Sequence, residues 1–272
     1  MVNGSHPAES VALLKKGELH VHLNGLVSPS LIRSILAEEA IPLPRDFDPN
    51  RDLTRTEPCA SLGDYLKPWQ VLRRIPLFPA NLQQMTHDAF NTLKENNVSF
   101  VEFRTSVIYL ANLQNCSVAS ALSRILEATE RSSERTGIRC GIVMTVTRGD
   151  YSAVQLETLL KAYRELEKPR NVVGLDLAGD EANQIPADLG SLFRQAKDTY
   201  GLGLTIHAGE IGIINNVIAA IHDFDADRIG HGTAAGASPE VMDELRRRDI
   251  CLEVCPISSR LTVSTPSSPL LR

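Results

Sequence analysis

Two histidines one residue apart are the first residues of this sequence whose spacing could serve chemistry. His20 and His22 lie in the stretch GELHVHLNG, residues 17–25, which is otherwise largely apolar. Successive side chains of an extended strand point to opposite faces, so the two imidazoles would share one face. Such a pair could bind a metal ion. It could equally be two partly buried histidines whose ring nitrogens are satisfied by backbone carbonyls.

Two further histidines follow strands of the same kind. His207 in TIHAGE and His231 in RIGHG stand, like the first pair, at the C-terminal ends of predicted strands. Four histidines gathered on one face would bury several polar groups without partners, unless a metal ion or a substrate meets them. Neutral imidazole is a common zinc ligand, and catalytic zinc typically has three protein ligands and an open water position. His20, His22 and His207 could supply the three ligands.

Carboxylates accompany these histidines. Glu210 lies three residues beyond His207, and the stretch GLDLAGDE ends a predicted strand with Asp176, Gly179, Asp180 and Glu181. Glu210 is better placed to act in such a site, because it comes soon after a candidate ligand. For Asp180 and Glu181 a solvated position in a loop is an equally good interpretation.

The elements that must position these residues alternate along the chain. Seven short β-branched runs occur at residues 17–23, 98–105, 140–146, 171–179, 203–209, 227–232 and 250–256. Segments of helical periodicity separate them, for example 117–137, which ends at Gly137, and 238–249, with Ser238 as N-cap and Pro239 in the first turn. Strands alternating with helices predict an α/β fold with a parallel sheet. A (β/α)8 barrel of the TIM type is favoured over a doubly wound sheet because no G-x-G-x-x-G follows any strand.

One long connection interrupts this alternation. Residues 41–80 lie between the first two predicted strands and are too long for a plain crossover. Since the loops after the strands build the active site of a barrel, we expect an inserted lid over its mouth. Leu62, Tyr65, Leu66 and Trp69 recur at helical spacing and could cover an apolar ligand, or they could simply pack the segment onto the barrel. No linker or repeat divides residues 1–272, which predicts a single domain.

Composition narrows the class of protein. The 272 residues are 43% hydrophobic and 22% charged, with a formal net charge of −5, as in ordinary globular domains. The chain lacks the basic field that nucleic-acid binding usually needs. The sequence shows neither a signal peptide nor a membrane-spanning run, so we expect a cytoplasmic protein that binds no membrane. The five cysteines without C-x-x-C spacing favour reduced thiols.

Six motifs in register resemble the adenosine deaminase family of metal-dependent amidohydrolases. They are ELHVHLNG, VEFR, VVGLDLAGDE, LTIHAGE, RIGHGT and ICLEVCPISS, and the resemblance runs from about residue 17 to residue 262. Each motif alone is modest, but six in this order are highly specific. The family's barrel fold agrees with the strand count.

The resemblance implies a role for each matching residue. His20, His22 and His207 correspond to the ligands of one zinc ion, and His231 to the histidine that takes a proton from water. Glu210 corresponds to the acid that protonates N1 of a purine, which requires a raised pKa. Gly179 resembles the glycine whose backbone contacts the purine ring. The expected substrate contacts are His22, Asn24, Gly179, Leu66 and Trp69. The expected partner is a small purine nucleoside or nucleotide, and the oligomeric state stays open.

The sequence departs from the family pattern at two places. Asn24 stands where the family usually has an aspartate that binds the ribose 5′-hydroxyl, and HLNG also resembles a subgroup that acts on N6-substituted AMP. The family's further zinc-ligating aspartate on strand eight has no counterpart, because the residues after Cys255 contain no acidic side chain. We therefore expect seven of the eight strands in this chain, which is interpreted as an incomplete barrel.

Three functions follow as hypotheses. The first is zinc-dependent conversion of adenosine to inosine and ammonia. The second is deamination of an N6-substituted purine nucleotide. The third is a non-catalytic purine- or metal-binding protein, which the missing strand-eight aspartate allows.

Overall fold

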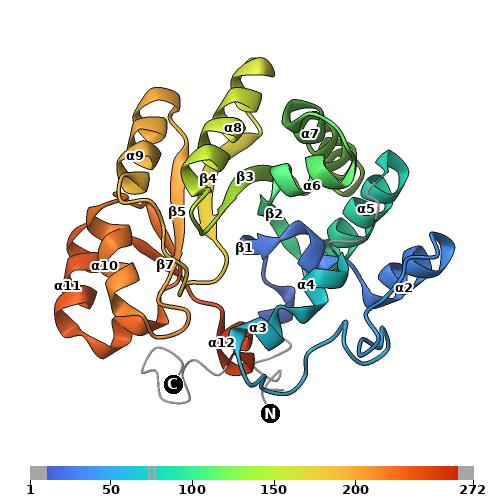
Figure 1. The fold of residues 1–272 in the computed structure, drawn as a ribbon, viewed down its shortest axis with the longest axis horizontal. Helices are drawn as coiled ribbons and strands as arrows, with labels where there is room; N and C mark the ends of the chain where they lie inside the picture. Colours follow the sequence, from blue (N-terminus) through green and yellow to red (C-terminus); the bar gives the residue numbers. More distant parts are fainter. Residues whose placement is uncertain (1–10, 73–74, 76–77, 263–272) are drawn as a thin grey trace, which may run out of the picture.

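Seven parallel strands form the centre of the molecule. A computed structural model describes residues 11–72, 75 and 78–262, and its strands pair in the order β1-β2-β3-β4-β5-β6-β7. They curve into a nearly closed barrel with the helices on its outer side (Figure 1). The strands are β1 Lys16–His22, β2 Val98–Thr105, β3 Arg139–Thr147, β4 Val172–Ala178, β5 Gly203–Ala208, β6 Arg228–His231 and β7 Cys251–Glu253. The α/β barrel predicted from the alternation of elements is confirmed, with seven strands among the described residues.

Helices follow the strands as the periodicity predicts. Their bounds are η1 Leu23–Leu26, α2 Pro29–Glu38, α3 Leu62–Tyr65, α4 Lys67–Leu72, α5 Pro79–Glu95, α6 Val107–Leu113, α7 Val118–Thr136, α8 Ser152–Glu165, α9 Leu189–Tyr200, α10 Ile214–His222, η2 Thr233–Ala237, α11 Pro239–Arg247 and α12 Pro256–Leu261. The Ser238 hydroxyl caps α11 by accepting from the amide of Val241 at 3.3 Å, and Gly137 ends α7 with a positive φ. Both helix ends were predicted from these residues.

The last strand is shorter than the sequence indicates. Residues 250–256 form a β-rich run, but β7 covers only Cys251–Glu253. Pro256 is the first residue of α12, because proline suits the first turn of a helix and has no amide hydrogen for a sheet. The turn between them places Cys255 at the C-terminal edge of the barrel.

The apolar core lies between the barrel and its helices. Phe90 of α5 and Phe103 of β2 are fully buried, with ring centroids 5.5 Å apart, and Phe193 of α9 meets Phe224 at 5.4 Å. Truncating such a buried phenylalanine costs about 3–5 kcal/mol. This layer holds the strands in place, while the barrel interior carries the polar residues discussed below.

The edges of the sheet are β1 and β7. Among the described residues each of these strands pairs on one side only. Their side chains nevertheless meet across the interior, since Nδ1 of His20 lies 3.0 Å from Oε2 of Glu253. The seam is therefore bridged by side chains at the level of the histidines.

The long connection after β1 contains more structure than a loop. Within residues 41–80 the helices α3 and α4 follow one another, and residues 73, 74, 76 and 77 lie outside the described part. Of the two, α3 lies beside α12 in Figure 1, and the backbone amide of Cys59 donates to the carbonyl of Leu261 at 2.7 Å. The connection is thus tied to the last described helix.

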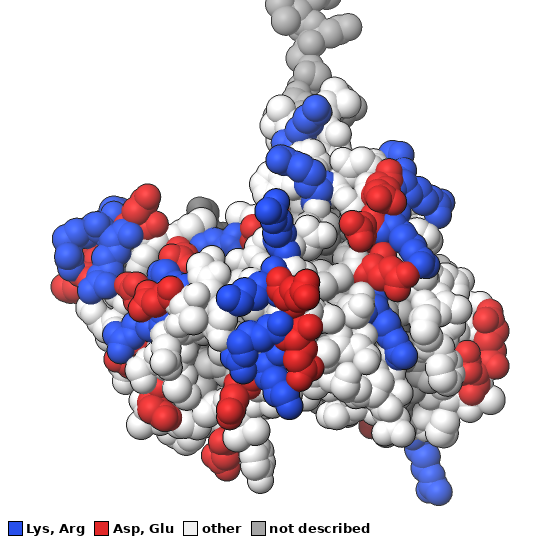
Figure 2. Space-filling view, turned by 90° about the horizontal axis from the view of Figure 1, so that it is seen from above, with Lys and Arg blue, Asp and Glu red and all other residues white. Residues whose placement is uncertain are grey.

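Charge is mixed over the surface. In the face shown in Figure 2, lysine and arginine side chains lie among aspartates and glutamates, in keeping with a net charge of only −5. No helix in the described residues has both the length and the apolar character needed to cross a membrane.

Candidate metal and catalytic site

Three strands bring four histidines together at the C-terminal end of the barrel. His20 and His22 come from β1, His207 from β5 and His231 from the end of β6. The ring of His20 has its centroid 4.7 Å from that of His207 and 4.8 Å from that of His231. Gly230 makes this approach possible, because a Cβ there would lie 2.8 Å from Cε1 of His20. The predicted convergence of imidazoles is what the geometry shows.

The donor set of His20, His22 and His207 fits a divalent transition metal. One ligand nitrogen from each ring lies within 4.8 Å of the others. Burial lowers the pKa of all three, that of His22 to about 3. The rings are therefore neutral at physiological pH and have lone pairs free for a cation. Three imidazoles are a donor set that suits zinc.

Two of these histidines have their other ring nitrogen held by a carboxylate. Nδ1 of His207 lies 2.8 Å from Oδ1 of Asp176, and Nδ1 of His20 lies 3.0 Å from Oε2 of Glu253. A carboxylate at Nδ1 keeps the proton there and leaves Nε2 as the ligand atom. Asp176 and Glu253 thereby orient the two rings, a role that was not predicted for either residue from the sequence.

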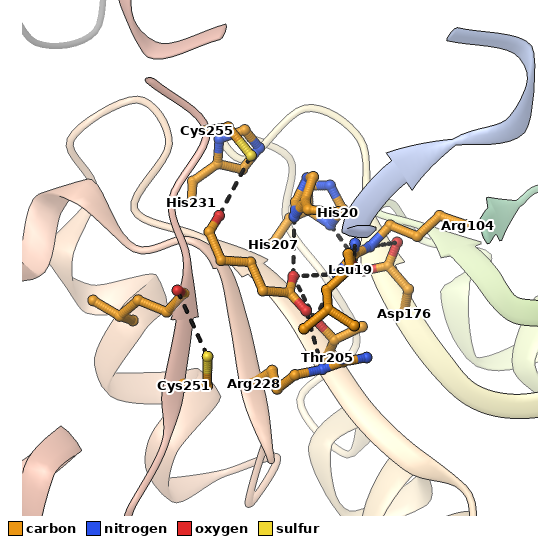
Figure 3. A network of polar contacts seen from close by, with 12 residues as sticks. Leu19, His20, Arg104, Asp176, Thr205, His207, Arg228, His231, Cys251 and Cys255 are labelled. Atoms are coloured by element: carbon orange, nitrogen blue, oxygen red, sulfur yellow. Dashed lines mark hydrogen bonds and ion pairs between the residues drawn. The ribbon is translucent and has the colours of Figure 1, made fainter. Parts of the chain in front are cut away.

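A fully buried arginine joins the two carboxylates. Arg104 of β2 donates to Oε2 of Glu253, and its Nε lies 3.4 Å from Oδ2 of Asp176. It also donates to the Leu19 carbonyl at 2.6 Å and to the Thr205 hydroxyl at 2.8 Å. Figure 3 shows this network beneath the histidines. Arg104 was not among the residues predicted for the site, although alternation along β2 places it on the barrel's inner face.

Glu210 and His231 face each other beside the three-histidine cluster. Nε2 of His231 lies 3.6 Å from Oε2 of Glu210. Burial, with help from the charges of Glu181 and Asp180, raises the pKa of Glu210 to about 7. Burial lowers the pKa of His231 to about 3. The pair thus offers a carboxyl that retains a proton near neutral pH and an imidazole that is free to accept one.

The acidic residues after β4 separate into two kinds. Glu181 is buried and accepts hydrogen bonds from the amides of Gly209 and Ile211, the latter at 3.0 Å. It therefore fixes the loop that carries Glu210, and the solvated alternative is wrong for this residue. Asp180 is exposed and accepts from the amide of Ala182 at 3.0 Å, as expected of a loop residue.

Gly179 and the inserted helices border the cluster. Gly179 has φ +104°, and a Cβ there would lie 3.2 Å from Cγ2 of Thr147, so this position needs glycine. The Trp69 ring of α4 stands edge-on to His22, with centroids 5.7 Å apart. Leu66, between α3 and α4, and Asn24, in η1, are half-buried.

Tyr65, from the same helical stripe as Leu66 and Trp69, also lies at this border. Its hydroxyl is hydrogen-bonded to the side chain of Ser258 in α12, and burial raises its pKa, with a contribution from the charge of Glu210. The tyrosine thus joins the inserted helices to the catalytic side of the barrel. Its helical spacing with Trp69 was visible in the sequence, but its partner in α12 was not.

A family profile and relatives of known function match this chain in sequence. The sequence profile described as adenosine deaminase matches residues 15–268. The adenosine deaminase of Clostridium acetobutylicum is 29% identical over 257 residues, covering 92% of this chain and 74% of that protein.

Two solved structures resemble the fold. An amidohydrolase from Burkhoderia ambifaria with bound zinc superimposes with a TM-score of 0.81 at 22% identity, covering 96% of this chain and 70% of that one. The N6-methyl-AMP deaminase of Arabidopsis thaliana gives 0.74 at 25% identity, with 94% and 75% covered. The profile match spans nearly the whole chain, and the protein therefore belongs to the adenosine deaminase family, a family of metal-dependent hydrolytic deaminases.

Proposed function

We propose that this protein removes the 6-amino group of a purine nucleoside or nucleotide by hydrolysis, with adenosine as the first candidate. The observation that supports the proposal is that Glu210 lies beside the cluster of neutral histidines and has its pKa raised to about 7. The products would be the 6-oxo purine, inosine for adenosine, and ammonia.

His20, His22 and His207 would hold a single zinc ion. When bound, zinc makes hydroxide available near neutral pH by acidifying water. Asp176 and Glu253 would keep the rings of His207 and His20 in the orientation that ligation requires. Hydrogen bonds within this chain thus decide which ring nitrogen of each histidine is left to bind the metal.

His231 and Glu210 would move the protons. The neutral His231 ring accepts a proton from the attacking water and orients its oxygen toward C6 of the purine. The protonated Glu210 donates to N1, which draws electrons away from C6 and opens it to attack. The C6–N6 bond then breaks as the amino group takes the proton held by His231 and leaves as ammonia. The remaining hydroxyl proton at C6 returns to Glu210, which leaves the 6-oxo group and restores the acid.

The inserted segment 41–80 would act as a lid on a single barrel domain spanning 1–272. Its support is the contact between Trp69 and His22, together with the bond from Tyr65 to Ser258. A purine lying against the backbone of Gly179 would be covered by Trp69 and Leu66. Such a cover excludes water from the reacting centre.

Asn24 favours a second candidate substrate, an N6-substituted AMP. An aspartate next to a 5′-phosphate would repel it, whereas asparagine carries no charge. The likeness to the N6-methyl-AMP deaminase of Arabidopsis points the same way. The adenosine-type motif HAGE, residues 207–210, keeps adenosine in first place.

The test is a substrate panel on zinc-loaded protein. Ammonia release would be compared for adenosine, adenine, AMP and N6-methyl-AMP, with Asn24→Asp as a matched variant. We expect adenosine to react fastest, and Asn24→Asp to slow the nucleotides more than adenosine. Faster turnover of N6-methyl-AMP would reverse the ranking. Zinc binding without ammonia from any of the four would refute the deaminase and favour a non-catalytic binding protein.

A further inference from the structure

Cys255 lies at the histidine cluster, although the proposed reaction does not use it. A ligand nitrogen of His20, one of His231 and Sγ of Cys255 lie within 4.8 Å of one another. Figure 3 shows the sulfur beside the His231 ring, on the turn after β7. The thiol donates weakly to the carbonyl of Glu253 at 3.4 Å. Two donor sets, one of three histidines and one with a thiol, therefore meet at His20.

A buried nitrogen of His231 without a hydrogen-bond partner among the described residues is a second, independent observation. The His231 side chain is buried, with only 4% of the residue exposed, and its Nδ1 has no hydrogen-bond partner among the described residues. Buried ring nitrogens in folded proteins are nearly always paired. An unpaired nitrogen within this cluster indicates a group that the protein itself does not supply.

We propose that Cys255, His231 and His20 form a second cation site, which takes a thiophilic divalent cation in competition with the three-histidine site. Sulfur and imidazole together select soft and borderline cations such as cadmium, cobalt and zinc. Carboxylate and water ligands would be expected instead for magnesium or calcium. The thiol and imidazole donors thus distinguish this site from a carboxylate site that would bind magnesium or calcium.

Sharing His20 couples the two sites. The Nδ1 of His20 is held by Glu253, which leaves one nitrogen for a metal. A cation held by Cys255 and His231 would therefore weaken the hold on a cation in the three-histidine site. This competition follows from the shared nitrogen of His20 and does not require the proposed deaminase activity.

The second site has a further consequence that rests on the proposed function. A cation on His231 would remove the imidazole lone pair that accepts the proton of water. Excess thiophilic cation should therefore inhibit the deaminase, and the inhibition should require Cys255. The effect would make the enzyme sensitive to the level of free zinc or cadmium.

Cobalt titration tests the site without any assay of activity. Ligation of Co²⁺ by a thiolate gives a near-ultraviolet charge-transfer band that histidine ligation does not give. Metal-free protein, Cys255→Ser and the control Cys251→Ser would be titrated with CoCl₂. Cys251 is the matched control because it lies on β7, four residues before Cys255, but is exposed. We expect the band in the native protein and in Cys251→Ser, and its loss in Cys255→Ser.

Other outcomes would overturn the proposal. These are no band in the native protein, or a band that persists in Cys255→Ser. Cys255→Ala, checked by circular dichroism, repeats the test with a second side chain that cannot ligate. The kinetic arm measures inhibition by CdCl₂, with an inhibition constant expected to rise at least about tenfold in Cys255→Ser and to stay unchanged in Cys251→Ser. If the charge-transfer band depends on Cys255 but the protein deaminates none of the purines, the proposed function is refuted and the second cation site is supported.

Discussion

Nδ1 of His20 lies 3.0 Å from Oε2 of Glu253, so a side-chain contact joins the first and last described strands of the barrel. The same carboxylate oxygen accepts from Arg104, and the other oxygen lies 3.0 Å from Nε of Arg228. Glu253 therefore links the orientation of a candidate metal ligand to the ion pairs of the barrel interior. Changes in this network should reach the metal site even where they leave the three ligands intact.

Glu253→Gln is expected to lower the zinc affinity of the protein about 10- to 100-fold, the usual effect of losing a carboxylate behind a ligating histidine. The amide cannot hold the Nδ1 proton of His20 as a charged carboxylate does. Competition with a chromophoric chelator measures the affinity. Glu102→Gln is the control, because Glu102 pairs with Arg228 from a more exposed position. Equal affinities in the two variants would contradict the role given to Glu253.

Arg104→Lys should destabilise the protein although it keeps the charge. The guanidinium serves Leu19, Thr205 and Glu253 in one plane, and an ammonium group cannot reach all of them. Buried hydrogen bonds of charged groups contribute about 1.5–3 kcal/mol each, so the free energy of unfolding should fall by at least about 2 kcal/mol. Urea unfolding of metal-free protein measures it. The exposed control Arg246→Lys should change it by no more than about 0.5 kcal/mol.

The local elements could be predicted from the sequence because their signals are local. The run 98–105 became β2 with the same bounds, and Ser238 caps α11 as its position before Pro239 indicates. The histidines could be predicted as a cluster because all four stand near the C-terminal ends of strands, and a parallel barrel brings those ends together.

The network behind the histidines could not be predicted, because it depends on side chains from strands far apart in the sequence. Arg104 and Glu253 are 149 residues apart, and each alone resembles a surface charge. One signal was available. Asp176 interrupts the otherwise apolar strand β4, and Arg104 alternates with Phe103 on β2, so both side chains were candidates for the barrel interior.

Trp69→Ala is expected to raise KM while leaving the affinity for zinc unchanged, if α4 covers the substrate. The ring contacts His22 and stands 3.2 Å from the Cβ position of Gly25, so it borders the site without ligating. An aromatic contact contributes about 0.5–1.5 kcal/mol, which corresponds to roughly a 2- to 13-fold change in KM. Steady-state kinetics on adenosine measure it. Tyr151→Ala, an exposed aromatic residue elsewhere, should leave KM as it is. A loss of kcat of roughly 2- to 13-fold with no change in KM would contradict the role of α4 as a lid.

The activity should fall as the pH rises through about 7, because Glu210 must keep its proton to donate it and its pKa is raised to about 7. The profile of kcat/KM against pH shows this limb for the free enzyme. Glu210→Gln should lose activity by about 10²- to 10⁴-fold and should lose the limb as well. Asp180→Asn is the informative control. It removes a negative charge that helps to raise the pKa of Glu210, so the limb should move to lower pH while activity is kept.

The same carboxyl should affect stability in the opposite sense to an ordinary ion-paired glutamate. The folded metal-free protein binds the Glu210 proton more tightly than the unfolded chain does, with a pKa of about 7 against a usual 4.5. Its contribution to stability is therefore complete below pH 4.5 and is lost as the pH rises through about 7. Above that pH, the free energy of unfolding of Glu210→Gln should exceed that of the native protein by up to roughly 3 kcal/mol. Urea unfolding measures the difference. If the variant and the native protein differ in unfolding free energy by the same amount at pH 5 and at pH 8, the carboxyl ionises freely and cannot serve as the acid proposed for N1.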